Sequence, residues 1–187
     1  MVRLPLSLQK KLAAVFPDAD ERNRFVTEIL TKALDTHAVS DTPGPQAIGG
    51  TLHLFTDGGS RGNPGQAAVG CVLFDPLENA VIREYGECIG IETNNIAEYK
   101  ALITGLKIAE EFHPNHLICH LDSELVVKQL NGEYRVKMAT FTPLVQEIND
   151  LKSRLPHVSF VYIPREKNTR ADLLVNRALD EMEGRKP

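Results

Sequence analysis

Hydrophobic and polar positions divide the chain into three parts. Apolar side chains recur at helical spacing in residues 6–16 and 20–34, which predicts two helices. The next stretch, "THAVSDTPGPQAIGG", is rich in proline, glycine and small side chains and keeps no apolar period. We therefore expect a small helical extension over 1–35, a linker over 36–50 and a folded domain over 51–187. The pattern leaves open whether the extension packs on itself, mediates self-association or contacts nucleic acid.

The part after the linker alternates between strand-like and helix-like patterns. Short β-rich runs predict strands at 51–56, 67–74, 80–89, 116–121 and 157–163. Helical periods predict helices at 95–112, at 123–130, from 142 onward and at 169–182. Three strands spaced like hairpins, followed by alternating strands and helices, give the order βββαβααβα. This order predicts an α/β fold with a mixed five-stranded sheet and helices on both faces.

Composition is that of an ordinary folded chain, since 42% of the 187 residues are hydrophobic and no apolar run approaches the length of a membrane span. Cys71, Cys88 and Cys119 are too few for a disulfide framework and favour a reducing compartment, so we expect a cytoplasmic protein without a membrane partner. The net charge of −4 weakens the case for a nucleic-acid partner, because phosphate binding usually leaves a basic surface. A site of carboxylates filled by metal cations would still bind phosphate.

Four acidic residues occupy similar places in this pattern. Asp57 and Asp122 follow predicted strands, and Glu98 and Asp172 fall near the starts of predicted helices. Each alone has an ordinary explanation as a turn residue, a helix cap or a capping-box acid. Strand ends and helix starts share one edge of an α/β layer, where four acids would repel one another unless cations lay between them. Such oxygen ligands suit two magnesium or manganese ions, an arrangement that promotes in-line attack on a phosphodiester.

The first of these acids is followed by glycines, in the segment "FTDGGSRGNPG" of residues 55–65. This segment matches neither Gly-x-Gly-x-x-Gly nor Gly-x-x-x-x-Gly-Lys, so it is not a dinucleotide or P-loop fingerprint. We interpret Gly58, Gly59 and Gly62 as positions where the absence of a side chain lets a phosphate backbone approach. Main-chain N–H groups of this segment could then donate hydrogen bonds to the phosphate oxygens.

Four segments taken together resemble the type 1 ribonucleases H. They are "TDGGSRGNPG" (56–65), "TNNIAEY" (93–99), "LDSELVVKQLNG" (121–132) and "PREKNTRADLLVNRAL" (164–179), in family order and each with its acid. The resemblance covers about residues 51–183. It implies the ribonuclease H fold, which agrees with the element order above. It also implies an endonuclease that hydrolyses the RNA strand of an RNA–DNA hybrid.

The resemblance further implies roles for matching residues. Four acids would ligate two magnesium ions, the first of them between both ions: Asp57, Glu98, Asp122 and Asp172. One ion would activate the attacking water and the other would stabilise the leaving 3′ oxygen, giving 5′-phosphate and 3′-hydroxyl ends. Backbone groups or side chains of five residues match positions that contact the hybrid: Gly58, Gly59, Asn63, Asn94 and Asn95. Recognition of 2′-hydroxyls across a wide minor groove would distinguish RNA from DNA.

Two departures from the family pattern bear on function. Many members carry a histidine in the loop before the last acid, whereas this loop reads "YIPREKNTR". The chain thus resembles the histidine-less archaeal-type and bacterial branch, with Arg165 or Lys167 as the candidate substitute. The family's basic protrusion is reduced to Arg135 and Lys137, so we expect modest, salt-sensitive affinity for the hybrid. Two alternatives stay open: a non-catalytic nucleic-acid binder, and a nuclease that prefers double-stranded RNA.

Overall fold

The computed structural model describes Asp18 and residues 49–184. The helices and strands below lie in one compact unit, Pro45–Pro187. The helices expected at 6–16 and 20–34, and nearly all of the linker, lie outside the described residues. The helical extension and its part in self-association therefore stay predictions.

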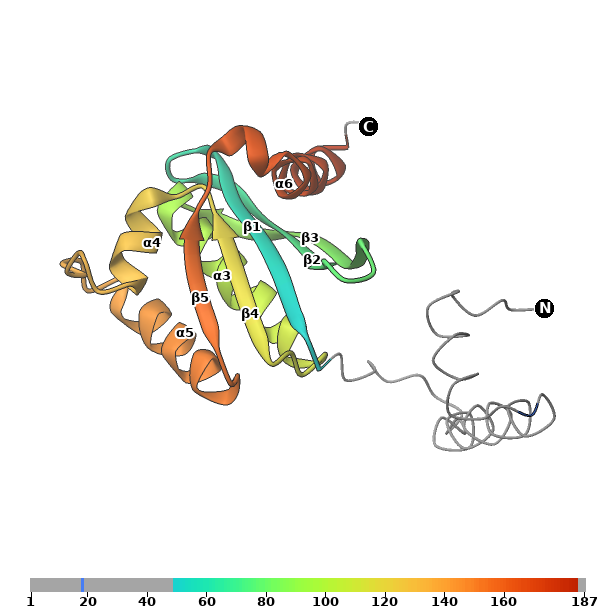
Figure 1. Ribbon diagram of the computed structural model, residues 1–187. Coiled ribbons are helices and arrows are strands. Elements are labelled where there is room, and N and C mark those ends of the chain that lie inside the picture. Colours follow the sequence, from blue (N-terminus) through green and yellow to red (C-terminus); the bar gives the residue numbers. More distant parts are fainter. Residues whose placement is uncertain (1–17, 19–48, 185–187) are drawn as a thin grey trace. The chain divides into compact units, whose positions relative to one another are not determined.

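A mixed five-stranded sheet forms the centre of this unit (Figure 1). Its strands are β1 (Thr51–Gly62), β2 (Gly65–Asp75), β3 (Ala80–Glu92), β4 (His116–Leu121) and β5 (Val158–Tyr162). They lie in the order β3-β2-β1-β4-β5. The first three strands pair antiparallel, and β4 and β5 continue the sheet beside β1 in parallel. The predicted mixed α/β sheet is confirmed.

Helices cover both faces of the sheet, as the element order predicts. The described helical elements are α3 (Asn94–Glu110), α4 (Glu124–Leu130), α5 (Thr142–Arg154), the 3₁₀ turn η1 (Arg165–Lys167) and α6 (Thr169–Met182). Successive residues of β1 meet different helices, since Gly58 approaches α3 and Gly59 approaches α6. Successive strand residues face opposite sides of a sheet, so α3 and α6 lie on opposite faces (Figure 1). None of the helices within the described part of the chain combines the length and the apolar character that a membrane crossing requires.

The main core lies between the sheet and the helices α3 and α5. Leu52, Leu54 and Leu73 of the strands pack with Leu102 and Leu106 of α3, and each is at most 1% exposed. The core cluster under α6 is much smaller and consists of Ala68, Val175 and Leu179. The fold therefore anchors α3 in more buried apolar surface than α6.

β1 is longer than the sequence pattern predicted. We expected it to end at Thr56, but it continues through the glycine-rich segment because β2 pairs with it there, with Asp57 opposite Gly70. The parallel pairing of β1 with β4 does stop at Thr56, opposite Leu121. Asp57 and Asp122 are therefore the first residues beyond the last β1–β4 pair, which brings the two acids close together.

Candidate active site

Three acidic side chains from separate elements meet where β1 and β4 stop pairing. Asp57 comes from β1, Glu98 from α3, and Asp122 from the residue after β4. One carboxylate oxygen from each lies within 4.8 Å of the other two. Asp57 is only 6% exposed, so the cluster is partly shielded from water.

Glu98 reaches this cluster because α3 approaches β1 very closely. A Cβ atom on Gly58 would lie 2.1 Å from the Ala97 carbonyl carbon and 2.3 Å from the Glu98 nitrogen. Against the larger opposite effects of burial and neighbouring acids, the main-chain N–H of Gly58 lowers the pKa of Asp57 and of Glu98. The space that we assigned to an approaching phosphate is thus filled at Gly58 by the backbone of α3. Glycine is required at position 62 for a different reason, since the φ of +107° in the tight turn before β2 is rarely adopted by other residues.

The fourth predicted acid, Asp172, lines the same cleft but contacts other partners. The cleft has a volume of about 370 Å³ and is lined by all four acids. Asp172 Oδ1 pairs with the Arg165 guanidinium at 2.6 Å, and Asp172 Oδ2 accepts a hydrogen bond from Asn176 at 2.9 Å. α6 comes close to the sheet because Gly70 leaves room, as a Cβ there would lie 2.3 Å from the Ala171 carbonyl oxygen. Asp172 therefore lies beside the three-acid cluster, with one of its oxygens held in an ion pair.

Burial and the charges of neighbouring acids favour protons on Asp57 and Glu98. Burial, followed by the charges of Asp122 and Asp172, raises the pKa of Asp57 to about 7 against an opposing effect of Arg165. Burial and the Asp57 charge also raise the pKa of Glu98 well above its usual range. Glu98 Oε2 is buried without a hydrogen-bond partner in the described residues. A hard divalent cation would relieve the repulsion and satisfy that oxygen, so the donor set fits magnesium or manganese.

Comparisons with known proteins identify the family of this chain. A family profile described as reverse transcriptase-like matches residues 55–178. Ribonuclease HI of Halobacterium salinarum is 41% identical over 133 residues, which cover 71% of this chain and 66% of that protein. The chain belongs to the type 1 ribonuclease H family.

Solved members of the ribonuclease H family share the fold described above. RNase H1 from Halobacterium salinarum is 40% identical, with a TM-score of 0.68 over 71% of this chain and 99% of that chain. LC11-RNase H1, solved in complex with an RNA/DNA hybrid, is 42% identical, with a TM-score of 0.66 over 70% of this chain and 98% of that chain. A bifunctional protein of Mycobacterium tuberculosis is 40% identical over 127 residues, which are 68% of this chain. The chain matches only 35% of the length of that mycobacterial protein.

The hybrid contacts expected from the ribonuclease H resemblance fall into two places. Four candidate residues line the acidic cleft: Gly58, Gly59, Asn94 and Arg165. Asn63 lies next to the cleft, because its Oδ1 accepts a hydrogen bond from the Asn94 N–H at 3.2 Å. Asn95 lines a neighbouring groove of about 550 Å³, together with Leu125 and Tyr134. The contacts of these residues with nucleic acid stay predictions.

Asn168 is a site residue that sequence reasoning missed. It precedes α6, where an asparagine suggests a helix cap, yet its side chain makes no capping hydrogen bond. It is 1% exposed and contacts the Asp122 carboxylate at 3.3 Å. Asn168 was assigned no role from the sequence, and the one available signal was its position four residues before Asp172.

Proposed function

We propose that this protein is an endonuclease that hydrolyses the RNA strand of RNA–DNA hybrids with the help of two magnesium or manganese ions. The observation that carries the proposal is the convergence of Asp57, Glu98 and Asp122 oxygens within 4.8 Å. Three carboxylates at this separation favour a bound cation, because their ionised forms repel one another strongly. Family membership and the hybrid bound to LC11-RNase H1 support the choice of substrate.

The four acids divide between the two proposed ions. Asp57, Glu98 and Asp122 would hold one ion, and Asp57 with Asp172 would hold the other. Binding of the second ion competes with the ion pair between Asp172 and Arg165. When bound, the ions supply an activated water and stabilise the leaving 3′ oxygen, which gives 5′-phosphate and 3′-hydroxyl ends.

Protons on the cluster make cation binding depend on pH. The pKa of Asp57 is raised to about 7, chiefly by burial, and the pKa of Glu98 is raised for the same reason. Carboxylates bind a cation in their ionised form, so binding releases these protons. Cation affinity, and with it cleavage, is therefore expected to rise as the pH increases through 7.

Residues at the rim of the cleft supply the proposed substrate contacts. Asn94 Oδ1 accepts the Ser60 N–H at 2.7 Å, and Asn63 bonds to Asn94, so these residues join the end of β1 to the start of α3. We assign this pair to the nucleic-acid backbone and ribose, where 2′-hydroxyls identify RNA. Arg165 stands in the loop where many family members have a histidine, and we assign it to phosphate charge as products leave.

Cleavage of labelled duplexes tests the proposal directly. The full-length protein is incubated with an RNA–DNA hybrid, an RNA duplex and a DNA duplex, each with magnesium or manganese. The expected result is cleavage of the hybrid alone, with 5′-phosphate ends on the RNA fragments. Asp122→Asn should lose turnover and largely keep hybrid binding. Binding without cleavage at every metal concentration, or preferred cleavage of the RNA duplex, would overturn the proposal.

A further inference from the structure

We propose that Asn168 is a positioning residue that holds the Asp122 carboxylate ready for cation binding. This inference deepens the proposed function and rests on it. Asn168 lies between η1 and α6 and is almost fully buried. Its Nδ2 group donates to the Thr56 carbonyl at 2.8 Å and to Asp122 Oδ1 at 3.3 Å.

The bond to Thr56 lies where the β1–β4 ladder ends. Thr56 and Leu121 are the last pair of that ladder, and the Leu121 carbonyl accepts the Ile163 N–H at 2.8 Å. Asn168 supplies a side-chain donor to the Thr56 carbonyl at this point. A single amide group thus ties the strand that carries Asp57 to the side chain of Asp122.

The backbone of Asn168 extends the connection to the fourth acid. Its N–H donates to the Arg165 carbonyl at 2.9 Å, and its carbonyl accepts the Asp172 N–H at 3.1 Å. Asn168 therefore contacts β1 just before Asp57, the Asp122 side chain and the helical turn that carries Asp172. A displacement of this residue would change the relative positions of three acids.

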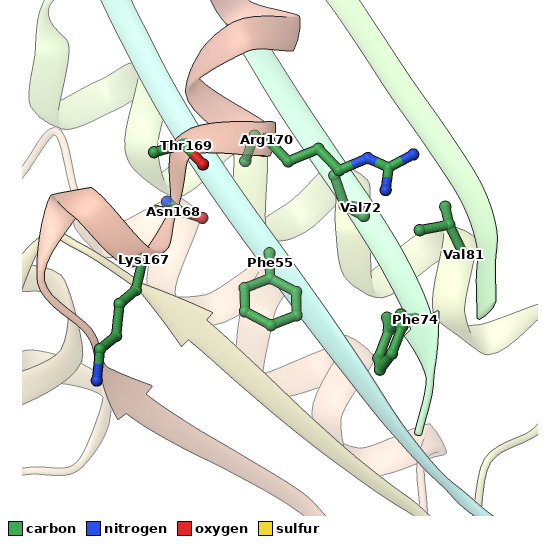
Figure 2. Close-up of a pocket in the computed structure, with 9 residues that line it drawn as sticks. Phe55, Val72, Phe74, Val81, Lys167, Asn168, Thr169 and Arg170 are labelled. Carbon is green, nitrogen blue, oxygen red and sulfur yellow. The ribbon is translucent and has the colours of Figure 1, made fainter. Parts of the chain in front are cut away.

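The neighbours of the Asn168 amide determine its orientation. Turning the amide over would set Oδ1 against the Thr56 carbonyl and the Asp122 carboxylate, neither of which donates a hydrogen bond. In the observed orientation Oδ1 is buried and has no hydrogen-bond partner in the described residues. Asn168 also lines an apolar pocket of about 230 Å³ with Phe55 and Val72 (Figure 2). A buried acceptor without a partner is unfavourable, so the two bonds donated by Nδ2 must outweigh it.

The bond to Asp122 gives the carboxylate a fixed orientation before any cation arrives. A side chain with one oxygen held by a donor has fewer arrangements to lose when its carboxylate becomes a ligand. Groups that hold a ligand in this way contribute to metal affinity without touching the metal. We therefore expect Asn168 to affect the affinity for the cation more than the affinity for the hybrid.

Asn168→Ala tests this expectation in the full-length protein. Calorimetric titration with Mn²⁺, without nucleic acid, should show affinity about 10-fold or more below that of the wild type. The Mg²⁺ concentration for half-maximal hybrid cleavage should rise by a similar factor. The KM for the hybrid at saturating Mg²⁺ should change by less than about twofold, because no substrate contact is removed.

Asn131→Ala is the matched control. Asn131 Nδ2 donates to the Phe160 carbonyl at 3.3 Å, so the same kind of bond is lost outside the cleft. This variant should keep wild-type Mn²⁺ affinity. If circular dichroism shows Asn168→Ala to be unfolded, Asn168→Ser provides a second variant, whose shorter hydroxyl cannot span both acceptors and should also weaken Mn²⁺ binding.

The outcomes separate this inference from the proposed function. Wild-type Mn²⁺ affinity in a folded Asn168 variant overturns the positioning role, whether or not hybrid is cleaved. An equal loss of Mn²⁺ affinity in Asn131→Ala also overturns it, because the effect would then follow from general destabilisation. If the wild type cleaves no hybrid but Asn168→Ala alone loses Mn²⁺ affinity, the nuclease proposal fails and the positioning role is supported.

Discussion

Asp57, Glu98 and Asp122 differ from Asp172 in how the fold holds them. The oxygens of the first three lie within 4.8 Å of one another. Asp172 lies beside them and is paired with Arg165 at 2.6 Å. The supporting helices differ as well, because α3 packs on the main core and α6 on a cluster of three buried residues. The comparison indicates three acids already placed close enough to share a cation, and a fourth acid that, in the proposed mechanism, would exchange the Arg165 guanidinium for a second ion.

The two arrangements have different electrostatic consequences. In the three-acid cluster, burial and the neighbouring charges raise the pKa of Asp57 to about 7, so that this side chain takes up a proton more readily. Asp172 instead forms an ion pair with the Arg165 guanidinium. Substitutions within the cluster should therefore have large effects on cleavage and on the pH dependence of stability. Substitution of the fourth acid should have a smaller effect.

Asp57→Asn is expected to have the largest effect, because Asp57 belongs to the cluster and is the ligand proposed to lie between both ions. Turnover of the hybrid should fall at least about 10³-fold, or about 4 kcal/mol of transition-state stabilisation. Single-turnover kinetics at saturating magnesium measures the fall, and filter binding checks that the hybrid is still bound. Asp75→Asn is the control, since Asp75 is equally buried at 6% exposure and accepts the Leu77 N–H at 2.8 Å. A fall of less than about 10-fold in Asp57→Asn would contradict the proposed role.

The stability of the metal-free protein should depend on the protonation of Asp57. The folded pKa of about 7 lies above the value of about 3.9 for an unfolded chain, so the folded state binds the extra proton between these values. This contribution is fully present below about pH 4 and is lost as the pH rises through about 7. In chelator, Asp57→Asn should exceed the wild type in free energy of unfolding by about 1–2 kcal/mol at pH 5 and by about 3–4 kcal/mol at pH 8.

Urea unfolding at the two pH values measures this difference. Magnesium should raise the free energy of unfolding of the wild type at pH 8 and have little effect on that of Asp57→Asn, because a ligand stabilises only a folded chain that binds it. Equal stability of the two proteins at pH 8 without metal would contradict the raised pKa.

The sequence was sufficient to predict the features of the fold and the site that depend on local patterns. Strand and helix periods were enough for the element order, and the four acids could be located because each follows a strand or begins a helix. The end of β1 could not be predicted, since its extension to Gly62 depends on pairing with β2. The need for glycine at position 58 could not be predicted either, because the atoms that exclude a side chain there belong to α3, about forty residues further along the chain.

Side-chain orientation was the second limit. The spacing of the acids along the sequence does not show that Asp172 forms an ion pair with Arg165 and lies outside the cluster of the other three acids. Asn168 was not singled out from the sequence, and an asparagine before a helix is common because it can serve as a cap. Its real contacts, with Thr56 and Asp122, join segments that are 112 and 46 residues away in the sequence.

Gly58→Ala should have the next largest effect, because it displaces the helix that carries Glu98. The added Cβ would lie 2.1 Å from the Ala97 carbonyl carbon, and a backbone atom cannot move aside as a side chain can. We expect a loss of about 1–3 kcal/mol in the free energy of unfolding, together with reduced cleavage. Gly59→Ala is the control, because its Cβ would meet the Val175 side chain at 3.1 Å. Equal losses of stability in the two variants would show that close packing of α3 is not what position 58 requires.

Asp172→Asn should have the smallest effect of the four, because the three-acid cluster stays complete. The asparagine keeps an oxygen for the second ion and frees Arg165 from its ion pair, so we expect turnover to fall about 10-fold, or about 1.4 kcal/mol. Asp180→Asn, on the same helix but paired with Arg61 at 2.5 Å, should leave turnover unchanged. Single-turnover kinetics over a range of magnesium concentrations measures both variants. A fall in Asp172→Asn as large as that in Asp57→Asn would show that all four acids act as one unit, and the distinction between the cluster and the fourth acid would then be wrong.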